Sequence, residues 1–196
     1  IVAPGPVEAL PMKSLRRQYD VNVFGLIETT QVFLPIIRET KGRIVNMSSV
    51  GGLISTPFLG AYNSTKFAVE AFSDSLRREL RVHGVKVIAI EPGTISTPIW
   101  EKGLNNSTSI RSEMKPESLA PYEDGMNRFE RQVKRTSQNG ISPDEVAQSV
   151  RRALTNSNPA VRELVLSNTE RFQLLLVRRL PTKWVDKLLQ KVYFRK

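Results

Sequence analysis

Residues 43–68 decide the fold, and they read RIVNMSSVGG, then LISTPFLG, then AYNSTKFA. The first block is a short β-branched run that ends in small polar residues and two glycines, which is typical of a strand followed by a loop. From Ala61 to about Val82, apolar residues recur at near-helical spacing, which predicts an amphipathic helix. A strand followed by a helix is the unit from which layered α/β folds are built.

The flanking sequence repeats this alternation. Upstream, we expect one long helix from an N-cap at Ser14 to about Glu39, bent or weakened at Gly25 and Pro35. Downstream, the nearly continuous apolar run 85–91 is typical of a strand buried on both faces. The later predicted elements are a helix from about 142 to 154, a strand at 161–166 and a basic helix over 170–194 broken at Pro181. This order predicts an α/β layer with a parallel sheet, whose ligands bind beyond the carboxyl ends of the strands.

The composition excludes several classes of protein. With 196 residues the chain fits one domain, and without Cys it has no disulfide, thiolate zinc site, iron–sulfur cluster or thiol nucleophile. The single histidine, His83, stands just before Gly84, where we expect a solvent-facing helix end, so a histidine-based triad and a metal site are not predicted. No apolar run reaches the ~18 residues of a membrane span.

The positive charge is concentrated at the C-terminus. Residues 171–196 contribute +7 of the net charge of +10, with Asp186 as their one acid. Interleaved apolar residues fit an interfacial helix on anionic lipid, giving possible peripheral membrane contact through the tail 170–196. The alternative is a helix packed on the domain with a solvated basic face. We expect no nucleic-acid binding, because no recognised reading module accompanies the charge.

Tyr62 and Lys66 lie four residues apart, so they share one face of the predicted helix. A neighbouring ammonium favours the phenolate and would bring the tyrosine toward acid–base work at neutral pH. By itself this pair is common on solvated helix surfaces. Ser49, at the end of a predicted buried strand and thirteen positions earlier, could meet the phenol.

Together these segments resemble the short-chain dehydrogenase/reductase family. Its active-site pattern is a strand, Asn-x-Ser-Ser, small residues, Pro, then Tyr-x-x-x-Lys, which residues 44–68 match. Asp20–Gly25 resembles the helix that bears the family's Asn, and Glu91–Thr97 resembles its nicotinamide loop. The resemblance covers residues 1–167, with a further match at 142–147.

This resemblance implies a Rossmann-type, doubly wound parallel sheet and an NAD- or NADP-dependent oxidoreductase that interconverts an alcohol and a carbonyl. It implies that Tyr62 is the general acid/base, that Ser49 hydrogen-bonds the substrate oxygen, and that Lys66 lowers the pKa of Tyr62 and contacts the cofactor ribose. Asn22 would bend its helix and hold a water that links Lys66 to solvent. The nicotinamide would be bound by Pro92, Gly93, Thr94, Ile95 and Thr97.

The family's Gly-rich phosphate turn, ribose selector and Asn-Asn-Ala-Gly segment have no counterpart here, and Ile1 matches the position just after them. We therefore expect residues 1–196 to be one incomplete Rossmann-like domain, a fragment without its N-terminal strands. The choice between NAD and NADP stays open. The other hypothesis is a truncated, catalytically silent domain that acts as a membrane- or protein-interaction module.

Residues 98–140 match the family's substrate lid, and their aromatic and Met side chains suggest a hydrophobic substrate such as a steroid, retinoid or long-chain compound. Core packing would explain these side chains equally well. The resemblance also implies a homodimer or homotetramer assembled through the two long helices. We expect a cytoplasmic protein, with a peripheral location at a membrane surface as the alternative.

Overall fold

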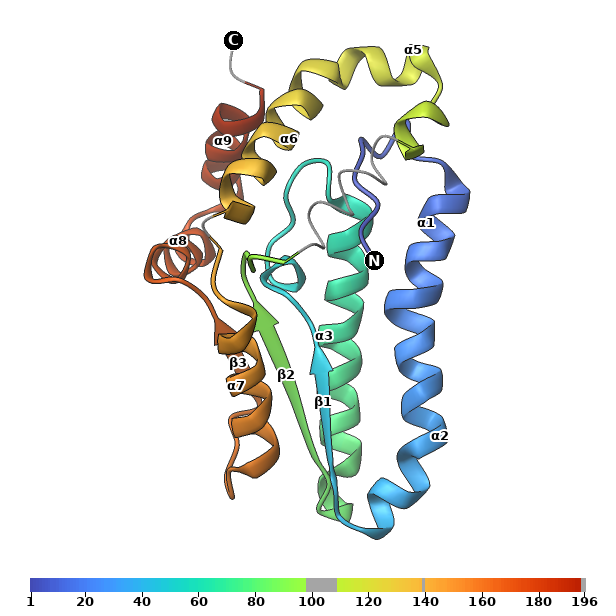
Figure 1. Cartoon of the computed structure of the whole chain (residues 1–196), viewed down its shortest axis with the longest axis vertical. Coiled ribbons are helices and arrows are strands. Elements are labelled where there is room, and N and C mark those ends of the chain that lie inside the picture. Colours follow the sequence, from blue (N-terminus) through green and yellow to red (C-terminus); the bar gives the residue numbers. More distant parts are fainter. Residues whose placement is uncertain (98–108, 139, 195–196) are drawn as a thin grey trace.

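A computed structural model describes residues 1–97, 109–138 and 140–194. Its centre is a parallel sheet with the order β1 (Arg43–Met47), β2 (Lys86–Pro92) and β3 (Arg162–Val165) (Figure 1). Met47 pairs with Ile90, and Pro92 pairs with Val165, so the carboxyl ends of the strands lie at one edge. The predicted α/β class with a parallel sheet is confirmed.

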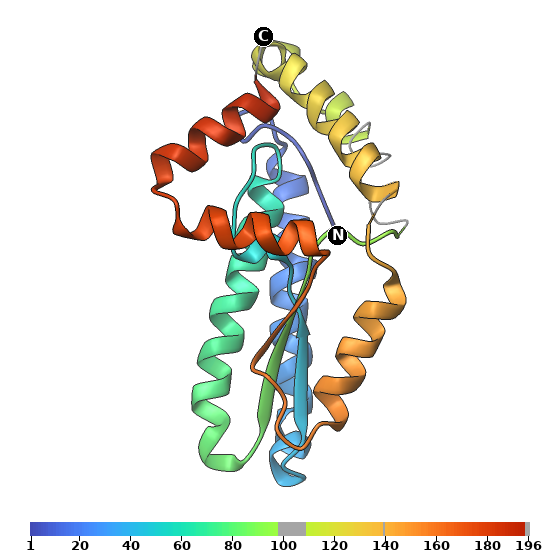
Figure 2. The ribbon, with the colours of Figure 1, turned by 90° about the vertical axis from the view of Figure 1, so that its left-hand side faces the viewer.

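Helices cover both faces of this sheet. On one face α3 (Gly60–Leu80) and α2 (Gly25–Glu39) pack on β1 and β2 through a core that includes Ile44, Leu76 and Val87. On the other face α7 (Pro143–Thr155) packs on β2 and β3 around Ile90 and Ala153, both 0% exposed. Figure 2 shows α3 and α7 on opposite sides of the strands. This packing explains the apolar run of β2, since a strand between two layers needs apolar side chains on both faces.

The expected helix from Ser14 to Glu39 begins earlier and is irregular. It consists of α1 (Met12–Tyr19), a π-helical turn η1 (Asp20–Phe24) and α2, which continues through Pro35. The predicted N-cap at Ser14 is wrong, because Pro11 occupies the cap and its carbonyl oxygen accepts the Ser14 amide at 3.0 Å. The fixed φ of proline favours a helix start at this point.

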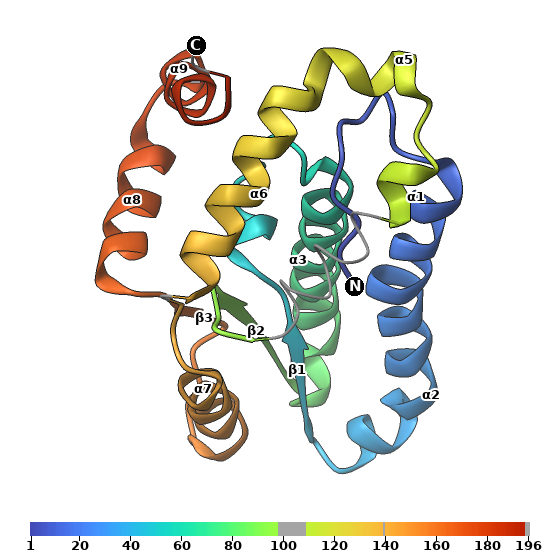
Figure 3. The ribbon, with the colours of Figure 1, turned by 45° about the horizontal axis from the view of Figure 1, so that its top comes forward.

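By length and composition alone, the continuous helix Met12–Glu39 could cross a membrane, with a hydropathy of 1.2 in its most apolar window. The expectation that no segment reaches this threshold is corrected here. The apolar residues of this helix are interrupted by polar residues and a few charges, so the helix contains no uninterrupted apolar run of membrane length although its mean hydropathy is high. In the structure this helix lies beside α3 (Figures 1 and 3).

The remaining helices lie mostly beyond the carboxyl ends of the strands, apart from the turn that ends α3, which lies at the opposite end of the molecule (Figure 1). Short helices α5 (Pro116–Leu119) and η4 (Ala120–Tyr122) lead into α6 (Glu123–Gln138), and the 3-10 turns η2 (Val50–Gly52) and η3 (Arg81–His83) follow β1 and α3. The basic tail forms α8 (Asn168–Arg179) and α9 (Thr182–Tyr193) on either side of Pro181, as predicted. His83 is exposed and precedes Gly84, whose φ is +73°, which confirms the expected helix end.

Candidate active site

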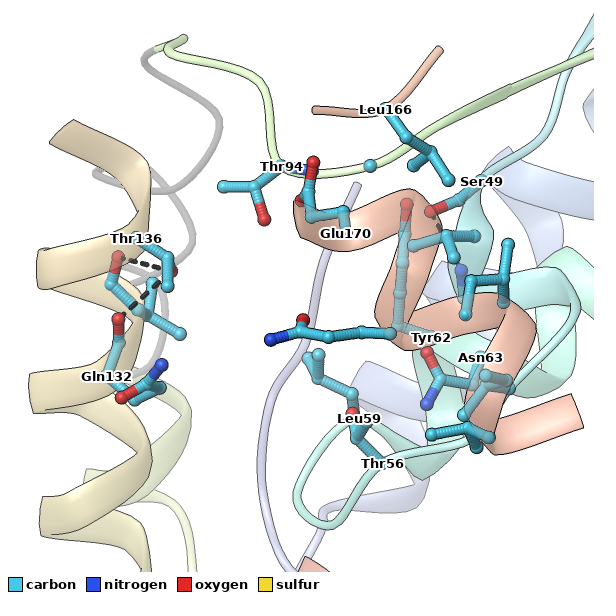
Figure 4. A pocket seen from close by; sticks show the side chains of 18 of the residues that line it. Ser49, Thr56, Leu59, Tyr62, Asn63, Thr94, Gln132, Thr136, Leu166 and Glu170 are labelled. Carbon is cyan, nitrogen blue, oxygen red and sulfur yellow. Dashed lines mark hydrogen bonds between the residues drawn. The ribbon is translucent and has the colours of Figure 1, made fainter. Parts of the chain in front are cut away.

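A cavity of about 330 Å³ opens beyond the carboxyl ends of β1 and β2. Ser49 and Tyr62 line it from the segments after β1, and Gly93 and Thr94 line it from the loop after β2. The far wall is formed by α6, with Gln132 and Thr136, and by α8, with Glu170 (Figure 4). The structure therefore brings four of the predicted site residues together at the edge of the sheet where the topology predicts a ligand.

Ser49 is held by two backbone groups. Its Oγ accepts the Gly51 amide at 3.1 Å, which caps η2, and it donates to the Pro92 carbonyl oxygen at 3.4 Å. The first contact sets the turn after β1, and the second joins this turn to the end of β2. A serine at this position therefore presents its hydroxyl to the cavity from a defined direction.

Tyr62 is in the first turn of α3 and points toward Ser49 (Figure 4). Burial raises the pKa of the Tyr62 phenol, and hydrogen bonding with the Ser49 side chain acts in the opposite direction. Lys66 places its Nζ 5.8 Å from the centre of the Tyr62 ring. The predicted closeness of Tyr62 to Ser49, and of the Lys66 ammonium to the Tyr62 ring, is present in the structure.

The expected effect of Lys66 on Tyr62 is not seen in this arrangement. The Lys66 ammonium donates to the Met47 carbonyl oxygen at 2.9 Å, and burial lowers its own pKa, with Glu70 opposing that shift. The pKa of Tyr62 is raised rather than lowered, because desolvation of the phenolate outweighs the favourable contacts. Lys66 lines a second hollow together with Met47 and does not line the Ser49 cavity.

Asn22 lies in the middle of the π-helical turn η1. The family resemblance implies a bend of the helix at this residue. Its Nδ2 donates to the Ile1 carbonyl oxygen at 2.9 Å and to the Thr65 Oγ1 at 3.1 Å, and its Oδ1 accepts the Ile1 amine at 2.8 Å. Asn22 therefore contacts the residue next to Lys66 and lines the same hollow as Lys66. π-Helical turns are frequent at functional sites.

The loop after β2 divides into two parts. Gly93 and Thr94 line the cavity, and Pro92 contributes its carbonyl oxygen to Ser49. Ile95 instead forms a bridge to Ile141, and the Thr97 amide donates to the Ile95 carbonyl oxygen at 2.9 Å. Neither Ile95 nor Thr97 lines this cavity, and their expected contact with the nicotinamide stays a prediction.

The second half of the expected lid contributes a wall of the cavity. Phe129 and Val133 of α6 line it beside the polar Gln132 and Thr136. Residues 98–108 of the expected lid, Trp100 among them, lie outside the described residues.

The sequence analysis did not find two features: the acidic residue Glu170 at the cavity, and an ionic cluster formed by Arg162, Glu70 and Glu91. Glu170 of α8 accepts the Thr94 amide at 2.8 Å, and its position three residues after Ser167 is a capping-box signal that could have drawn attention to it. Behind the site, Arg162 Nε lies 3.0 Å from a carboxylate oxygen of both Glu70 and Glu91. Burial and the charge of Glu70 raise the pKa of Glu91 to about 7. No local pattern brings these three residues together.

Comparison with known proteins gives the same family at three levels. A sequence model described as short chain dehydrogenase matches residues 1–107. The chain is 33% identical over 192 residues to the NADPH-dependent 3-dehydrocapnine reductase of Ornithobacterium rhinotracheale, covering 95% of this chain and 65% of the relative. It is 36% identical over 198 residues to mouse (Mus musculus) retinol dehydrogenase 16, covering 94% and 59%. The chain thus spans less than two thirds of the length of these two relatives.

Among solved structures, the fold matches a short chain dehydrogenase/reductase from Burkholderia phymatum in complex with NAD. The TM-score is 0.70 at 25% identity, over 100% of this chain and 66% of the other. The match covers the whole chain, and the three-stranded parallel sheet with its helices belongs to the Rossmann-like α/β folds.

Proposed function

The chain belongs to the short-chain dehydrogenase family, and from this premise we propose that it carries the catalytic and substrate part of an NAD(P)-dependent oxidoreductase that interconverts an alcohol and a carbonyl. The observation that carries the proposal is the convergence of Ser49, Tyr62 and Thr94 on one cavity at the carboxyl edge of the sheet. One relative is named an NADPH-dependent reductase, and one similar solved structure is a complex with NAD. Both support a nicotinamide cofactor, and the choice between NAD and NADP stays open.

The residues fit the nicotinamide end of such a cofactor. The Tyr62 side chain and the loop at Gly93 and Thr94 line the same cavity of about 330 Å³. Gly93 and Thr94 would hold the ring, with Pro92, Ile95 and Thr97 supporting the loop, and Lys66 would contact the ribose. When bound, the nicotinamide supplies a hydride to a carbonyl carbon or accepts one from an alcohol carbon.

In the reducing direction, Tyr62 donates its phenol proton to the carbonyl oxygen as the hydride reaches the carbon. The raised pKa of Tyr62 keeps the phenol protonated at neutral pH, as an acid requires. Ser49 donates a hydrogen bond to the same oxygen and stabilises the negative charge that develops there. The ammonium of Lys66, 5.8 Å from the ring centre, would favour the phenolate that remains after proton transfer, whereas burial dominates the pKa of the resting phenol. Asn22, through Thr65, supports the start of α3 and the proton path from Lys66 to solvent.

The test is Tyr62→Phe in the full-length protein, with NADH and NADPH oxidation followed on a panel of carbonyl compounds. We expect loss of at least about 1000-fold in kcat with cofactor Kd changed less than about threefold, because the phenol acts on the substrate oxygen. Asn63→Ala, a buried neighbour whose Nδ2 donates to Ser55 at 3.2 Å, is the control for disturbance of the same helix turn. Full activity in Tyr62→Phe would overturn the role proposed for Tyr62. Absence of activity in the wild-type protein with every carbonyl compound and both cofactors would favour the catalytically silent interaction domain.

We propose that the substrate is hydrophobic, of the steroid, retinoid or long-chain type. Apolar side chains from four segments line the cavity, among them Leu59, Phe129, Val133 and Leu174. A relative is a retinol dehydrogenase by name, which supports this class. Retinoid, steroid and aliphatic carbonyls in the panel, against a short polar ketone, would separate these classes by kcat/KM.

We also propose assembly as a homodimer or homotetramer through α2 and α3. Large apolar side chains on these helices are exposed, with Val32 at 73%, Ile36 at 59% and Phe67 at 44%. A second copy of the same helices would cover them. Light scattering of the full-length protein and of Val32→Glu, which we expect to dissociate it, tests this assembly.

A second candidate function is peripheral attachment of a cytoplasmic protein to an anionic membrane surface through α9. Trp184 and Leu188 are exposed on one face, and Lys187 and Lys191 border the same shallow groove of about 420 Å³. The Lys187 Nζ lies 5.8 Å from the centre of the Trp184 ring. Apolar side chains beside lysines suit the boundary between acyl chains and acidic headgroups.

Flotation with phosphatidylserine-containing vesicles tests this attachment. We expect Trp184→Ala to weaken binding and Lys134→Ala, an exposed lysine on α6, to leave it unchanged. Absence of binding by the full-length protein at low salt would overturn it.

A further inference from the structure

Glu170 has two structural tasks, one for each carboxylate oxygen. Its Oε2 accepts the Ser167 amide at 3.0 Å and the Ser167 hydroxyl at 2.9 Å, while the Ser167 Oγ accepts the Glu170 amide at 3.3 Å. This capping box starts helix α8. A capping box uses one carboxylate oxygen, which leaves the other available for a different partner.

The second oxygen reaches the loop after β2. Oε1 accepts the Thr94 amide at 2.8 Å, a contact between residues 76 positions apart. Burial acts to raise the pKa of Glu170, but the donors from Thr94 and Ser167 outweigh it and the pKa is lowered. The carboxylate is therefore ionised at neutral pH, and its hydrogen bond to Thr94 is charge-assisted and strong.

The loop and the start of α8 are packed too closely for a side chain between them. A Cβ at Gly93 would lie 2.6 Å from Leu166 Cδ2 and 2.8 Å from Glu170 Oε1. Glycine at this position allows the approach, and the Glu170–Thr94 bond uses it. Gly93, Thr94, Leu166 and Glu170 all line the cavity, and Figure 4 shows the Glu170 carboxylate beside Thr94.

We propose that Glu170 is a positioning residue that fixes the Gly93–Thr94 backbone and thereby sets the affinity of the site for the nicotinamide cofactor. This inference rests on the proposed function, in which the loop after β2 holds the nicotinamide. It makes the start of the basic tail part of the cofactor site, because α8 supplies the carboxylate. The alternative is that Glu170 serves only as a helix cap.

Ser167→Ala is the matched control, because it removes the cap hydroxyl and leaves the Thr94 bond in place. In the full-length protein, hydrogen exchange of the Thr94 amide and the Kd for NADH and NADPH are measured for wild type, Glu170→Ala, Glu170→Gln and Ser167→Ala. Exchange reports on the bond itself, and Kd reports on its effect. Glu170→Gln keeps an oxygen that can accept the Thr94 amide, so it tests the role if the alanine variant does not fold.

We expect Glu170→Ala to raise the exchange rate of the Thr94 amide and the Kd of the cofactor by about tenfold or more. This is the size of effect that follows from loss of a hydrogen bond to a charged group. Glu170→Gln should fall between wild type and the alanine variant, and Ser167→Ala should stay within about twofold of wild type. Equal effects of Glu170→Ala and Ser167→Ala on both readouts would overturn the inference alone. Wild-type protein that binds neither NADH nor NADPH would overturn the proposed function and the inference together.

Discussion

Ser49 and Tyr62, thirteen residues apart in the chain, line the same cavity with the Tyr62 side chain pointing toward Ser49 (Figure 4), and this contact acts against the pKa shift that burial imposes on the phenol. Burial raises the pKa of Tyr62 because the phenolate loses solvation, and the Ser49 contact lowers it because the hydroxyl stabilises the phenolate. The pair therefore tunes the group that the proposed reaction uses for proton transfer.

Ser49→Ala should raise the pKa of Tyr62 further, because it removes the contact that favours the phenolate. The chain has four tyrosines, so the Tyr62 signal is isolated by difference. The ultraviolet titration of Tyr62→Phe is subtracted from that of the wild type, and the titration of the double variant Ser49→Ala/Tyr62→Phe is subtracted from that of Ser49→Ala. We expect the difference titration to move to higher pH by about one unit. A titration at the same or lower pH would show that Ser49 does not act on the phenol.

Glu91→Gln should remove a pH dependence of stability. The pKa of Glu91 is about 7 in the folded protein against 4.5 for an ordinary glutamate, with Glu70, Arg162 and Arg178 as the charges that act on it. The folded state thus holds a proton that the unfolded state releases between these values, so the free energy of unfolding falls as pH rises from about 4.5 to 7.

Urea unfolding at pH 5 and pH 8 measures this effect. Relative to wild type, Glu91→Gln should gain about 1–3 kcal/mol more at pH 8 than at pH 5. Glu28→Gln, an exposed carboxylate on α2, should show no such difference. Parallel pH profiles for wild type and Glu91→Gln would contradict the prediction.

Gly52→Ala should displace the turn η2 from helix α3. The added Cβ would lie 2.9 Å from the Lys66 carbonyl oxygen and 3.0 Å from Glu70 Cγ, and the helix backbone cannot yield without moving Tyr62 and Lys66 relative to Ser49. We expect a loss of about 1–3 kcal/mol in the free energy of unfolding. Activity should fall as well.

Gly42→Ala is the control for Gly52→Ala, because its Cβ would meet neighbours at 3.4 Å or more. Chemical denaturation of both variants measures the difference. Equal stability of the two variants would show that the close approach at Gly52 is not constrained.

Ile90→Ala should lower the free energy of unfolding by about 2–5 kcal/mol. The Ile90 side chain is 0% exposed in a core cluster with Val146 and Ala153 of α7 and Val165 of β3, so its truncation leaves a cavity. Val161→Ala, at a position 50% exposed before β3, should change stability by less than about 1 kcal/mol. The midpoint and slope of urea unfolding decide the comparison, and similar losses in the two variants would argue against the central place of β2.

The sequence by itself determined the class of the fold, the strands and most helices, because hydrophobic periodicity depends on which face of each element is buried. It also predicted that Tyr62 lies close to Ser49 and Lys66, because their spacing along one strand end and one helix start is a local property. Their catalytic roles, and the binding of the nicotinamide by the loop after β2, stay predictions.

Only the tertiary structure decided how distant segments meet. The bond from Thr94 to Glu170, the cluster of Arg162 with Glu70 and Glu91, and the contact of Lys66 with Met47 join elements far apart in the chain. Their formation depends on the close approach of packed helices and strands. The direction of the Tyr62 pKa shift likewise follows from burial, which is a property of the whole fold and of no single motif.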